Sequence, residues 1–324
     1  MAEKFICNDL YKHLIDRKYY DQILFLSNEE CDKNAGDRDL SGIEGCILQP
    51  FYINKSFLDR MPNLKFAQAT SAGYDRVDTD ELRRRGITLL NTRGVMSISI
   101  AEDVFSKILF FSRRIRHVEE MKKKHQWDMF GQDQWMCTCY DDLYGKNIGI
   151  MGYGSIGREI AKRAEAFGMH VLVYDIVKPD DKRITAYFPA AELDKFYGSC
   201  DFLVVSLPLL DATRHIIDAS AFQKMKPSAV LINVARGPLV NTEDLITALN
   251  SGEIAGAAID VYEEEPLPAD SPLWGTEHLF MSSHKAGMGD TWKGFIGALI
   301  MRNIDHYLRG EKLENIIRLQ EDHS

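Results

Sequence analysis

The chain is poor in the features that mark several protein classes. Its 324 residues include 6 cysteines, 10 prolines and 23 glycines. Such low counts exclude a disulfide framework, a collagen-like chain and a low-complexity chain. No run of 18 apolar residues occurs, so we expect no membrane-spanning helix and no membrane partner. The first residues carry charges where a secretory signal needs an apolar stretch, which predicts a cytoplasmic protein.

Positive charge is also scarce. Lysine and arginine number 39 against 48 aspartates and glutamates, which gives a net charge of −9. Such a chain is a poor candidate for gripping a phosphate backbone, so we predict no nucleic-acid partner. The one basic stretch, residues 113–124, contains two glutamates and is typical of a solvated helix face. Cys137 and Cys139 form a C-x-C pair without the other ligands of a zinc site, so no metal is expected.

What the chain does contain is a regular alternation of short apolar runs and longer helical patterns. This alternation predicts βαβ units, parallel sheets and an α/β fold, and the length suggests about two domains of ~150 residues. A single helix is expected from about 99 to 124, and the last helix from about 291 to 309. Strands are expected at 5–7, 23–26, 43–48, 64–69, 87–91, 146–151, 170–174, 202–207, 230–234, 255–261 and 279–282. We expect two doubly wound sheets with a cleft between them.

A glycine-rich loop follows the strand expected at 146–151. Its residues are Gly152, Tyr153, Gly154, Ser155, Ile156 and Gly157, a G-x-G-x-x-G placed between a strand and a helix. In a dinucleotide fold the glycines allow a tight turn, close approach of a pyrophosphate and helix–strand packing. The next strand ends in Asp175, whose carboxylate suits the ribose hydroxyls of NAD and repels the 2′-phosphate of NADP. FAD shares the loop fingerprint, so the loop alone does not select a nicotinamide.

Three chemically useful residues follow expected strands of the same domain. They are Arg236, a glutamate of the run 263–265, and His284. An imidazole can exchange a proton near neutral pH, and a neighbouring carboxylate would orient it. A guanidinium can hold a carboxylate and polarise a carbonyl group. Each residue alone is more often structural, but together they suit carbonyl reduction or alcohol oxidation beside a hydride donor.

The chain resembles the D-isomer-specific 2-hydroxyacid dehydrogenases, a family that includes glyoxylate/hydroxypyruvate reductases and phosphoglycerate dehydrogenases. The resemblance rests on five stretches in family order, namely 71–78, 152–157 with Asp175, 233–237, 260–268, and 284–287. It implies a flavodoxin-like substrate-binding domain formed by 1–98 and 293–324, and an NAD-binding Rossmann domain at 99–292. It also implies a homodimer paired through the nucleotide-binding domain.

The same resemblance implies roles for individual residues. Arg236 would hold the carboxylate and carbonyl oxygen of a small 2-oxo acid, His284 would be the general acid/base, and Glu265 its partner. The substrate would also meet Ser71, Ala72, Gly73 and Lys285. Beside the glycine loop, the cofactor would meet Ser206, Leu207 and Pro208 at the adenosine, and Val234, Ala235 and Asp260 near the nicotinamide.

The chain departs from the family pattern next to the histidine. Ser283 stands where proline is usual, and Lys285 where a small or apolar residue is usual. Lys285 leaves open a phosphorylated or phosphonate substrate. A corepressor-like protein that senses NAD(H) on the same fold is the alternative of another class, since a fold does not fix a function. The aromatic pair Phe51 and Tyr52, after a first-domain strand, is a candidate for substrate contact or for core.

Overall fold

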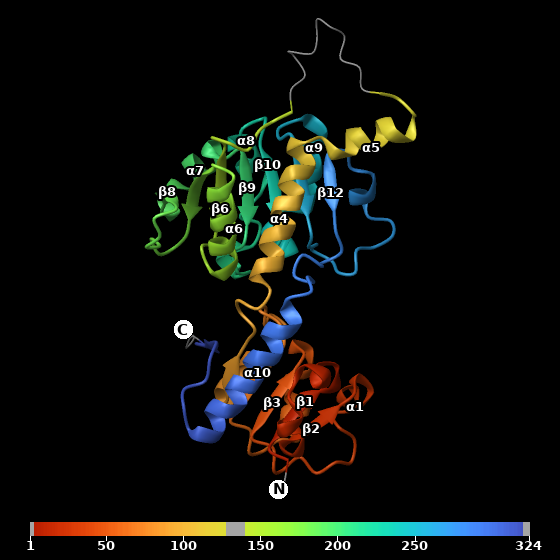
Figure 1. Ribbon diagram of the computed structural model, residues 1–324, viewed down its shortest axis with the longest axis vertical. Coiled ribbons are helices and arrows are strands. Elements are labelled where there is room, and N and C mark those ends of the chain that lie inside the picture. The colour runs from red at the N-terminus through yellow and green to blue at the C-terminus, as the bar shows by residue number, and fades with distance from the viewer. Residues whose placement is uncertain (1–2, 128–139, 320–324) are drawn as a thin grey trace, which may run out of the picture. The chain divides into compact units, whose positions relative to one another are not determined.

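The computed structural model describes residues 3–127 and 140–319, which fold into two compact units (Figure 1). The first unit comprises 1–96 and 289–324, and the second comprises 97–288. These divisions fall within four residues of the domain boundaries expected at 98/99 and 292/293. Which unit binds the substrate and which binds the cofactor stays a prediction. The expected α/β architecture with two sheets is confirmed.

The second unit is built on a seven-stranded parallel sheet. Its spatial order is β12-β11-β10-β9-β6-β7-β8, so the strand order reverses between β6 and β9. In an open α/β sheet a ligand binds beyond the carboxyl ends of the strands at such a reversal. The strands are β6 (Asn147–Met151), β7 (His170–Tyr174), β8 (Ile184–Phe188), β9 (Phe202–Val205), β10 (Val230–Asn233), β11 (Gly256–Ile259) and β12 (Leu279–Met281).

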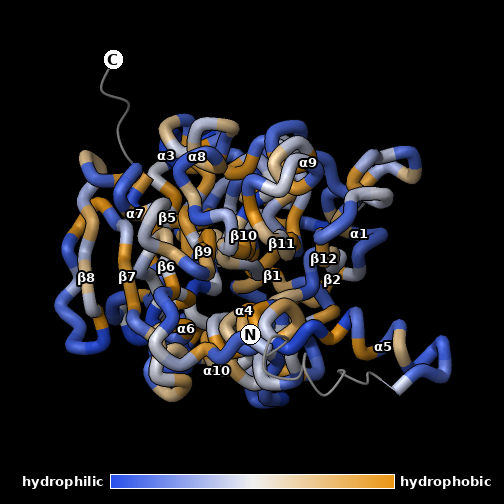
Figure 2. The backbone as a smooth tube through the Cα atoms, turned by 90° about the horizontal axis from the view of Figure 1, so that it is seen from above, coloured by the Kyte–Doolittle hydropathy of each residue, from blue (hydrophilic) through white to orange (hydrophobic). Residues whose placement is uncertain are grey.

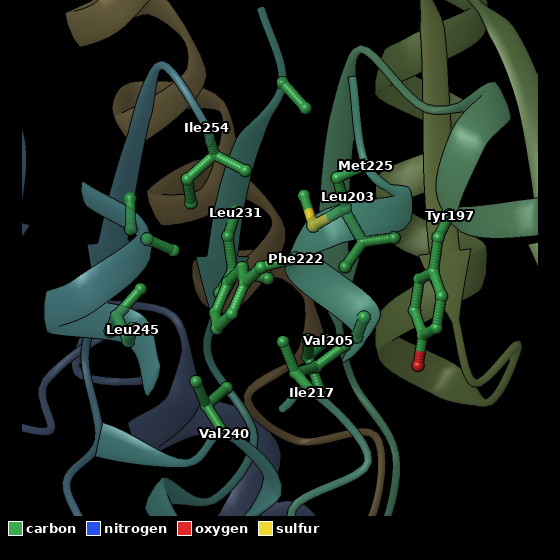
Figure 3. Close-up of a cluster of buried hydrophobic side chains, with 14 of the residues drawn as sticks. Tyr197, Leu203, Val205, Ile217, Phe222, Met225, Leu231, Val240, Leu245 and Ile254 are labelled. Atoms are coloured by element: carbon green, nitrogen blue, oxygen red, sulfur yellow. The ribbon is translucent and has the colours of Figure 1, made fainter. Parts of the chain in front are cut away.

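Helices cover both faces of this sheet, because its central strands are apolar on both sides. Strands β9, β10 and β11 are fully buried and hydrophobic in colour in Figure 2. One face packs against α4 (Ser97–Ser112) and α6 (Ser155–Ala166). The other packs against α7 (Leu193–Ser199), α8 (Ala219–Lys224) and α9 (Thr242–Ser251), where Phe222 is fully buried (Figure 3).

The first unit repeats this plan around a six-stranded sheet. Its spatial order is β13-β5-β4-β3-β1-β2, with β13 the antiparallel edge strand. The strands are β1 (Phe5–Asn8), β2 (Ile23–Leu26), β3 (Gly45–Leu48), β4 (Phe66–Ala69), β5 (Thr88–Leu90) and β13 (Ile316–Ile317). One face packs against α10 (Trp292–Arg309), and the other face against α1 (Asn28–Asp32), α2 (Lys55–Leu58) and α3 (Thr79–Arg85).

Three elements differ from the sequence expectation. The single helix expected at 99–124 is two helices, α4 and α5 (Ile115–Lys123), because Arg114 adopts a left-handed conformation with φ of 49°. Strand β8 was not predicted, since its side chains are only partly buried and give a weak pattern. The tail after α10 contributes β13, which pairs with β5 although it is only two residues long.

Two further expectations concern membrane-spanning helices and metal-binding side chains. Within residues 3–127 and 140–319, every helix is too short or too polar to span a bilayer. The same residues contain no grouping of three or more His, Cys, Asp or Glu side chains suited to a metal ion. Cys137 and Cys139 lie outside the described residues. The four free cysteines of the described part are Cys7, Cys31, Cys46 and Cys200, and all are buried.

Candidate active site

The glycine loop lies at the strand reversal of the second unit, between the end of β6 and the start of α6. Gly154 is the residue that precedes the first turn of α6, and Ser155 and Ile156 open the helix. The unpaired N–H groups of that turn and the helix dipole suit an anion. The loop is also held from the neighbouring strand β9, because Oγ of Ser206, the residue after that strand, lies 3.0 Å from Met151 O and 2.8 Å from Gly152 O.

The three glycines are required for different reasons. Gly152 has φ of +91°, and a Cβ there would lie 2.9 Å from Ser206 O. A Cβ on Gly157 would lie 2.4 Å from Gly152 O. A Cβ on Gly154 would meet no atom of the described residues within 4 Å, and its φ of −76° is ordinary. Packing within the protein therefore explains the first and third glycines, whereas the second leaves open space that a bound pyrophosphate could occupy.

Asp175 lies at the carboxyl end of β7, beside the loop. Its Oδ2 accepts a hydrogen bond of 2.6 Å from Tyr153 N, which ties the acid to the glycine loop. Its Oδ1 accepts a long hydrogen bond of 3.4 Å from Val177 N, and the residue is partly exposed. The carboxylate therefore keeps acceptor capacity for a ribose hydroxyl. These donor and acceptor groups fit a dinucleotide.

The side chain of Tyr153 is bound within the protein. Tyr153 is buried, and its hydroxyl donates to Asp181 Oδ2 at 3.0 Å. Burial and the neighbouring carboxylate raise the pKa of Tyr153 to about 12. Among the loop residues predicted to bind the cofactor, Tyr153 would therefore contribute through its backbone.

Arg236 lies in the loop after β10, which the backbone of the next loop approaches closely. A Cβ on Gly237 would lie 1.9 Å from the carbonyl carbon of Tyr262, so only glycine permits this packing. Asn233 fixes the loop from inside, since its Nδ2 donates to Arg236 O at 2.9 Å and its Oδ1 accepts from Ala235 N at 3.1 Å. Arg236 is half-buried, and its Nη1 donates to Ala235 O at 2.7 Å.

His284 and Glu265 form a contact between the loops after β12 and β11. His284 Nδ1 lies 2.7 Å from Glu265 Oε2, and Glu265 Oε1 accepts from Tyr262 N at 3.0 Å. The glutamate side chain is 27% exposed and the imidazole 51%, so the carboxylate is fixed while the ring faces open space. Within the described residues Nε2 has no hydrogen-bond partner. This is the geometry of an oriented general acid/base.

Asp260, at the end of β11, is 1% exposed and binds protein donors. Oδ1 accepts from Ser282 Oγ at 2.6 Å and Lys285 N at 3.0 Å, and Oδ2 accepts from Ala286 N at 2.8 Å. The Asp260 carboxylate therefore organises the turn that carries His284. Its expected place near a nicotinamide stays a prediction. The Lys285 side chain is exposed and forms no ion pair within the described residues.

The substrate residues expected in the first unit lie after β4. Ser71 Oγ donates to Gly73 O at 2.6 Å, and Asn91 Nδ2 donates to Ala72 O at 2.7 Å. These bonds fix the loop through its carbonyl groups. The backbone N–H groups of Ala72 and Gly73 donate no hydrogen bond within the described chain. They can therefore bind a carboxylate.

The two aromatic candidates after β3 differ in their environments. Tyr52 is 7% exposed, and its hydroxyl donates to Asp32 Oδ1 at 2.9 Å. Phe51 is 43% exposed. Strand β3 pairs with β4 through Leu48 and Ala69, so Phe51 follows the same sheet edge as Ala72. Tyr52 belongs to the core, and Phe51 is the candidate for substrate contact.

A second histidine–carboxylate contact was missed in the sequence. His215 Nε2 lies 2.5 Å from Glu263 Oε1, and His215 N donates to Pro238 O at 2.8 Å. These bonds join the loops after β9, β10 and β11. No motif marks His215, and only the tertiary structure pairs it with a member of the glutamate run.

A cavity of about 680 Å³ lies at the amino ends of the strands of the seven-stranded sheet, opposite the edge at which the predicted site residues lie. It is lined by Phe202, Val230 and Ala255, at the amino ends of β9, β10 and β11, and by His278 before β12. None of the predicted site residues lines it.

Comparisons with known proteins show the family to which the chain belongs. Residues 105–286 match the family model described as the D-isomer specific 2-hydroxyacid dehydrogenase, NAD binding domain. A glyoxylate reductase of Thermofilum pendens is 35% identical over 286 residues, which cover 88% of this chain and 83% of the relative.

Two solved structures extend the likeness to the whole fold. A D-isomer specific 2-hydroxyacid dehydrogenase family protein of Aeromonas salmonicida has a TM-score of 0.84 and 28% identity, covering 99% of this chain and 100% of that one. An NADPH-dependent glyoxylate/hydroxypyruvate reductase of Sinorhizobium meliloti, in complex with NADP and sulfate, has a TM-score of 0.81 and 25% identity. That match covers 97% and 98% of the two chains. This chain is an oxidoreductase with a nicotinamide cofactor, and it belongs to the D-isomer specific 2-hydroxyacid dehydrogenase family.

Proposed function

We propose that the protein reduces a small 2-oxo acid to a D-2-hydroxy acid with NADH, using His284 as the general acid. The observation that carries the proposal is the 2.7 Å contact between His284 Nδ1 and Glu265 Oε2 at the carboxyl ends of β12 and β11. A histidine held in this way by a carboxylate stays correctly oriented and is stabilised when protonated. Nε2 is left to face a reacting oxygen.

The cofactor would supply the hydride, and the residues of the second unit would hold it. The loop Gly152–Gly157 and the first turn of α6 suit the pyrophosphate, and Ser206, Leu207 and Pro208 flank the adenosine side. Val234 and Ala235 are buried at the end of β10 and suit the nicotinamide side. Asp175 favours NADH, because its carboxylate would repel the 2′-phosphate of NADPH.

The substrate would be held by its carboxylate and its carbonyl oxygen. The guanidinium of Arg236 can bind both, and the N–H groups of Ala72 and Gly73 can bind the carboxylate. His284 Nε2–H then donates its proton to the carbonyl oxygen as negative charge develops there. In the oxidation of the hydroxy acid His284 accepts that proton. The names of the relatives support glyoxylate and hydroxypyruvate as substrates.

One alternative substrate class rests on a specific residue. Lys285 follows His284 directly and is exposed, so it can pair with a phosphate or phosphonate group of a larger substrate. An enzyme of this family with an intact His284–Glu265 contact is expected to turn over its ligand, which disfavours a pure NAD(H) sensor.

Pairing of two chains through the second unit also remains a proposal, tested by the mass of the protein in solution.

The test is NADH oxidation against a panel of 2-oxo acids, with NADPH in parallel. The panel contains glyoxylate, hydroxypyruvate, pyruvate, a branched and an aromatic 2-oxo acid, and a phosphorylated 2-oxo acid. We expect turnover of the small acids with NADH and little with NADPH. A preference for the phosphorylated acid that is lost in Lys285→Ala would move the assignment to the alternative. Tight NADH binding without any turnover would overturn the proposed reaction.

A further inference from the structure

The loop that follows β4 is held by the residues that follow β5. We call residues 71–73 the Ala72 loop. Asn91 Nδ2 donates to Ala72 O at 2.7 Å, and Thr92 N donates to Ser71 O at 3.2 Å. The two loops lie side by side because β4 and β5 pair in parallel and end at the same edge of the six-stranded sheet. Two carbonyl groups of the Ala72 loop therefore bind the chain after β5.

These two carbonyl groups set the direction of two N–H groups. The carbonyl of Ser71 shares a peptide unit with the N–H of Ala72, and the carbonyl of Ala72 shares one with the N–H of Gly73. Both units are trans, so each is planar and its C=O and N–H point in opposite directions. Neither N–H donates a hydrogen bond within the part of the chain that the structure describes. A donor bound to either carbonyl therefore fixes the direction in which the N–H group of the same unit can bind a ligand.

The Asn91 side chain is itself held in one orientation. Asn91 is 4% exposed, and its Oδ1 accepts from Arg93 N at 3.1 Å, which closes a local turn. Because Arg93 N can only donate, the amide oxygen faces it and the amide nitrogen faces Ala72 O. The turn after β5 thus presents a fixed donor to the Ala72 loop.

The C-terminal tail holds the same turn from the other side. Strand β5 lies between β4 and β13 in the sheet, and Ile316 of β13 pairs with Leu90. Asn315 Nδ2 donates to Asn91 O at 3.2 Å and to Arg93 O at 2.9 Å, and Asn91 N donates to Asn315 O at 3.3 Å. Asn315 has φ of 56°, a conformation that asparagine adopts more readily than most residues. A continuous chain of hydrogen bonds therefore joins the tail to the Ala72 loop.

We propose that Asn91 is a positioning residue for the carboxylate of the substrate, and that Asn315 holds Asn91 in place. Asn91 orients the peptide unit between Ala72 and Gly73, and its hydrogen bond to the carbonyl polarises that unit, so the N–H of Gly73 becomes a stronger donor. Neither asparagine touches the substrate. The inference rests on the proposed function, in which the N–H groups of Ala72 and Gly73 bind the carboxylate of a 2-oxo acid.

The test separates recognition of the carboxylate from general damage to the fold. Asn91→Ser keeps a side-chain oxygen that can accept from Arg93 N, but it lacks the amide that donates to Ala72 O. We expect kcat/KM for glyoxylate to fall about tenfold in this variant. The value for glyoxal, an aldehyde without a carboxylate, should change by less than about twofold, because it makes no use of the two N–H groups.

Oxamate, a 2-oxo acid mimic that is not reduced, gives a readout without turnover. Its dissociation constant from the protein–NADH complex should rise about tenfold in Asn91→Ser, whereas that of NADH should stay the same. Asn315→Gly allows the left-handed conformation and removes the amide, so it should raise the oxamate constant by a smaller factor, about threefold. It is also the second variant if Asn91→Ser does not fold.

Asn63→Ser is the matched control on the same unit. Asn63 Nδ2 donates to Ser41 O at 2.7 Å, which is the same kind of bond at the same length as that from Asn91 to Ala72. Asn63 and Ser41 are both exposed, and neither is a predicted site residue. The control should leave oxamate binding and both values of kcat/KM unchanged.

The outcomes distinguish failure of this role from failure of the proposed reaction. Equal losses with glyoxylate and glyoxal in Asn91→Ser, or an unchanged affinity for oxamate, would overturn the positioning role. If the parent reduces no 2-oxo acid but binds oxamate, and Asn91→Ser weakens that binding, the positioning role stands and the proposed reaction fails.

Discussion

The imidazole of His284 and the carboxylate of Glu265 meet at 2.7 Å although they are 19 positions apart in the chain. Each residue follows a neighbouring strand of one parallel sheet, and Tyr262 N fixes the second oxygen of the carboxylate. One oxygen of the Glu265 carboxylate contacts His284 and the other accepts from Tyr262 N. Because the pair is already held in place, it loses little conformational entropy when a substrate binds.

Replacing His284 with alanine should lower kcat by about 10²–10⁴-fold, because the proposed general acid is lost. NADH binding, followed by protein or cofactor fluorescence, should remain, since the glycine loop and Asp175 are unchanged. Full kcat in the variant would refute the role of His284.

Replacing Glu265 with glutamine should lower kcat by at least about tenfold, because the amide cannot stabilise a protonated imidazole. Glu264→Gln is the control within the same acidic run, since Glu264 is exposed. Steady-state kinetics of the two variants check the difference. Equal effects would mean that the net charge of the run matters rather than the contact with His284.

Replacing Asp175 with asparagine should raise the ratio of NADPH to NADH efficiency (kcat/KM) by about tenfold, equivalent to about 1.4 kcal/mol. The amide oxygen can still accept from Tyr153 N, so the loop should stay in place while the repulsion of a 2′-phosphate is lost. Asp180→Asn, an exposed position a few residues on, is the control. An unchanged ratio would exclude Asp175 as the selecting residue.

Alanine at two glycines of the loop should separate stability from cofactor binding. Gly157→Ala should lower the free energy of unfolding by about 1–3 kcal/mol, because the new Cβ lies 2.4 Å from Gly152 O. The new Cβ of Gly154→Ala would meet no atom within 4 Å in the part of the chain that the structure describes, so this variant should leave Tm unchanged while weakening NADH binding. Thermal unfolding and an NADH titration measure the two effects. Unaltered NADH affinity in Gly154→Ala would contradict the placement of the pyrophosphate.

Substitutions at the aromatic pair after β3 should also differ. Phe51→Ala should shift the preference toward larger 2-oxo acids, because an exposed ring that follows the same sheet edge as Ala72 is removed. Tyr52→Phe should lower stability by about 1 kcal/mol through loss of the bond to Asp32. Its substrate preference should stay the same. A changed preference in Tyr52→Phe alone would reverse the assignment of the two rings.

Much of this protein could be predicted from its sequence. Hydrophobic alternation predicted the two α/β sheets, and the spacing from Gly152 to Asp175 predicted the nucleotide loop, because these signals are local in the chain. The break at Arg114 and the edge strands β8 and β13 were missed. A single positive φ and short, partly buried strands leave little trace in the hydrophobic pattern.

Only the tertiary structure decided which side chains meet. The sequence placed Arg236, Glu265 and His284 after separate strands, and parallel pairing of β10, β11 and β12 brought those strand ends to one edge. The tertiary structure also bound the Asp260 carboxylate to residues 282–286 around His284, paired His215 with Glu263, and buried Lys107 against Asp103. These contacts join loops or cover a charge through packing, so no spacing in the sequence specifies them.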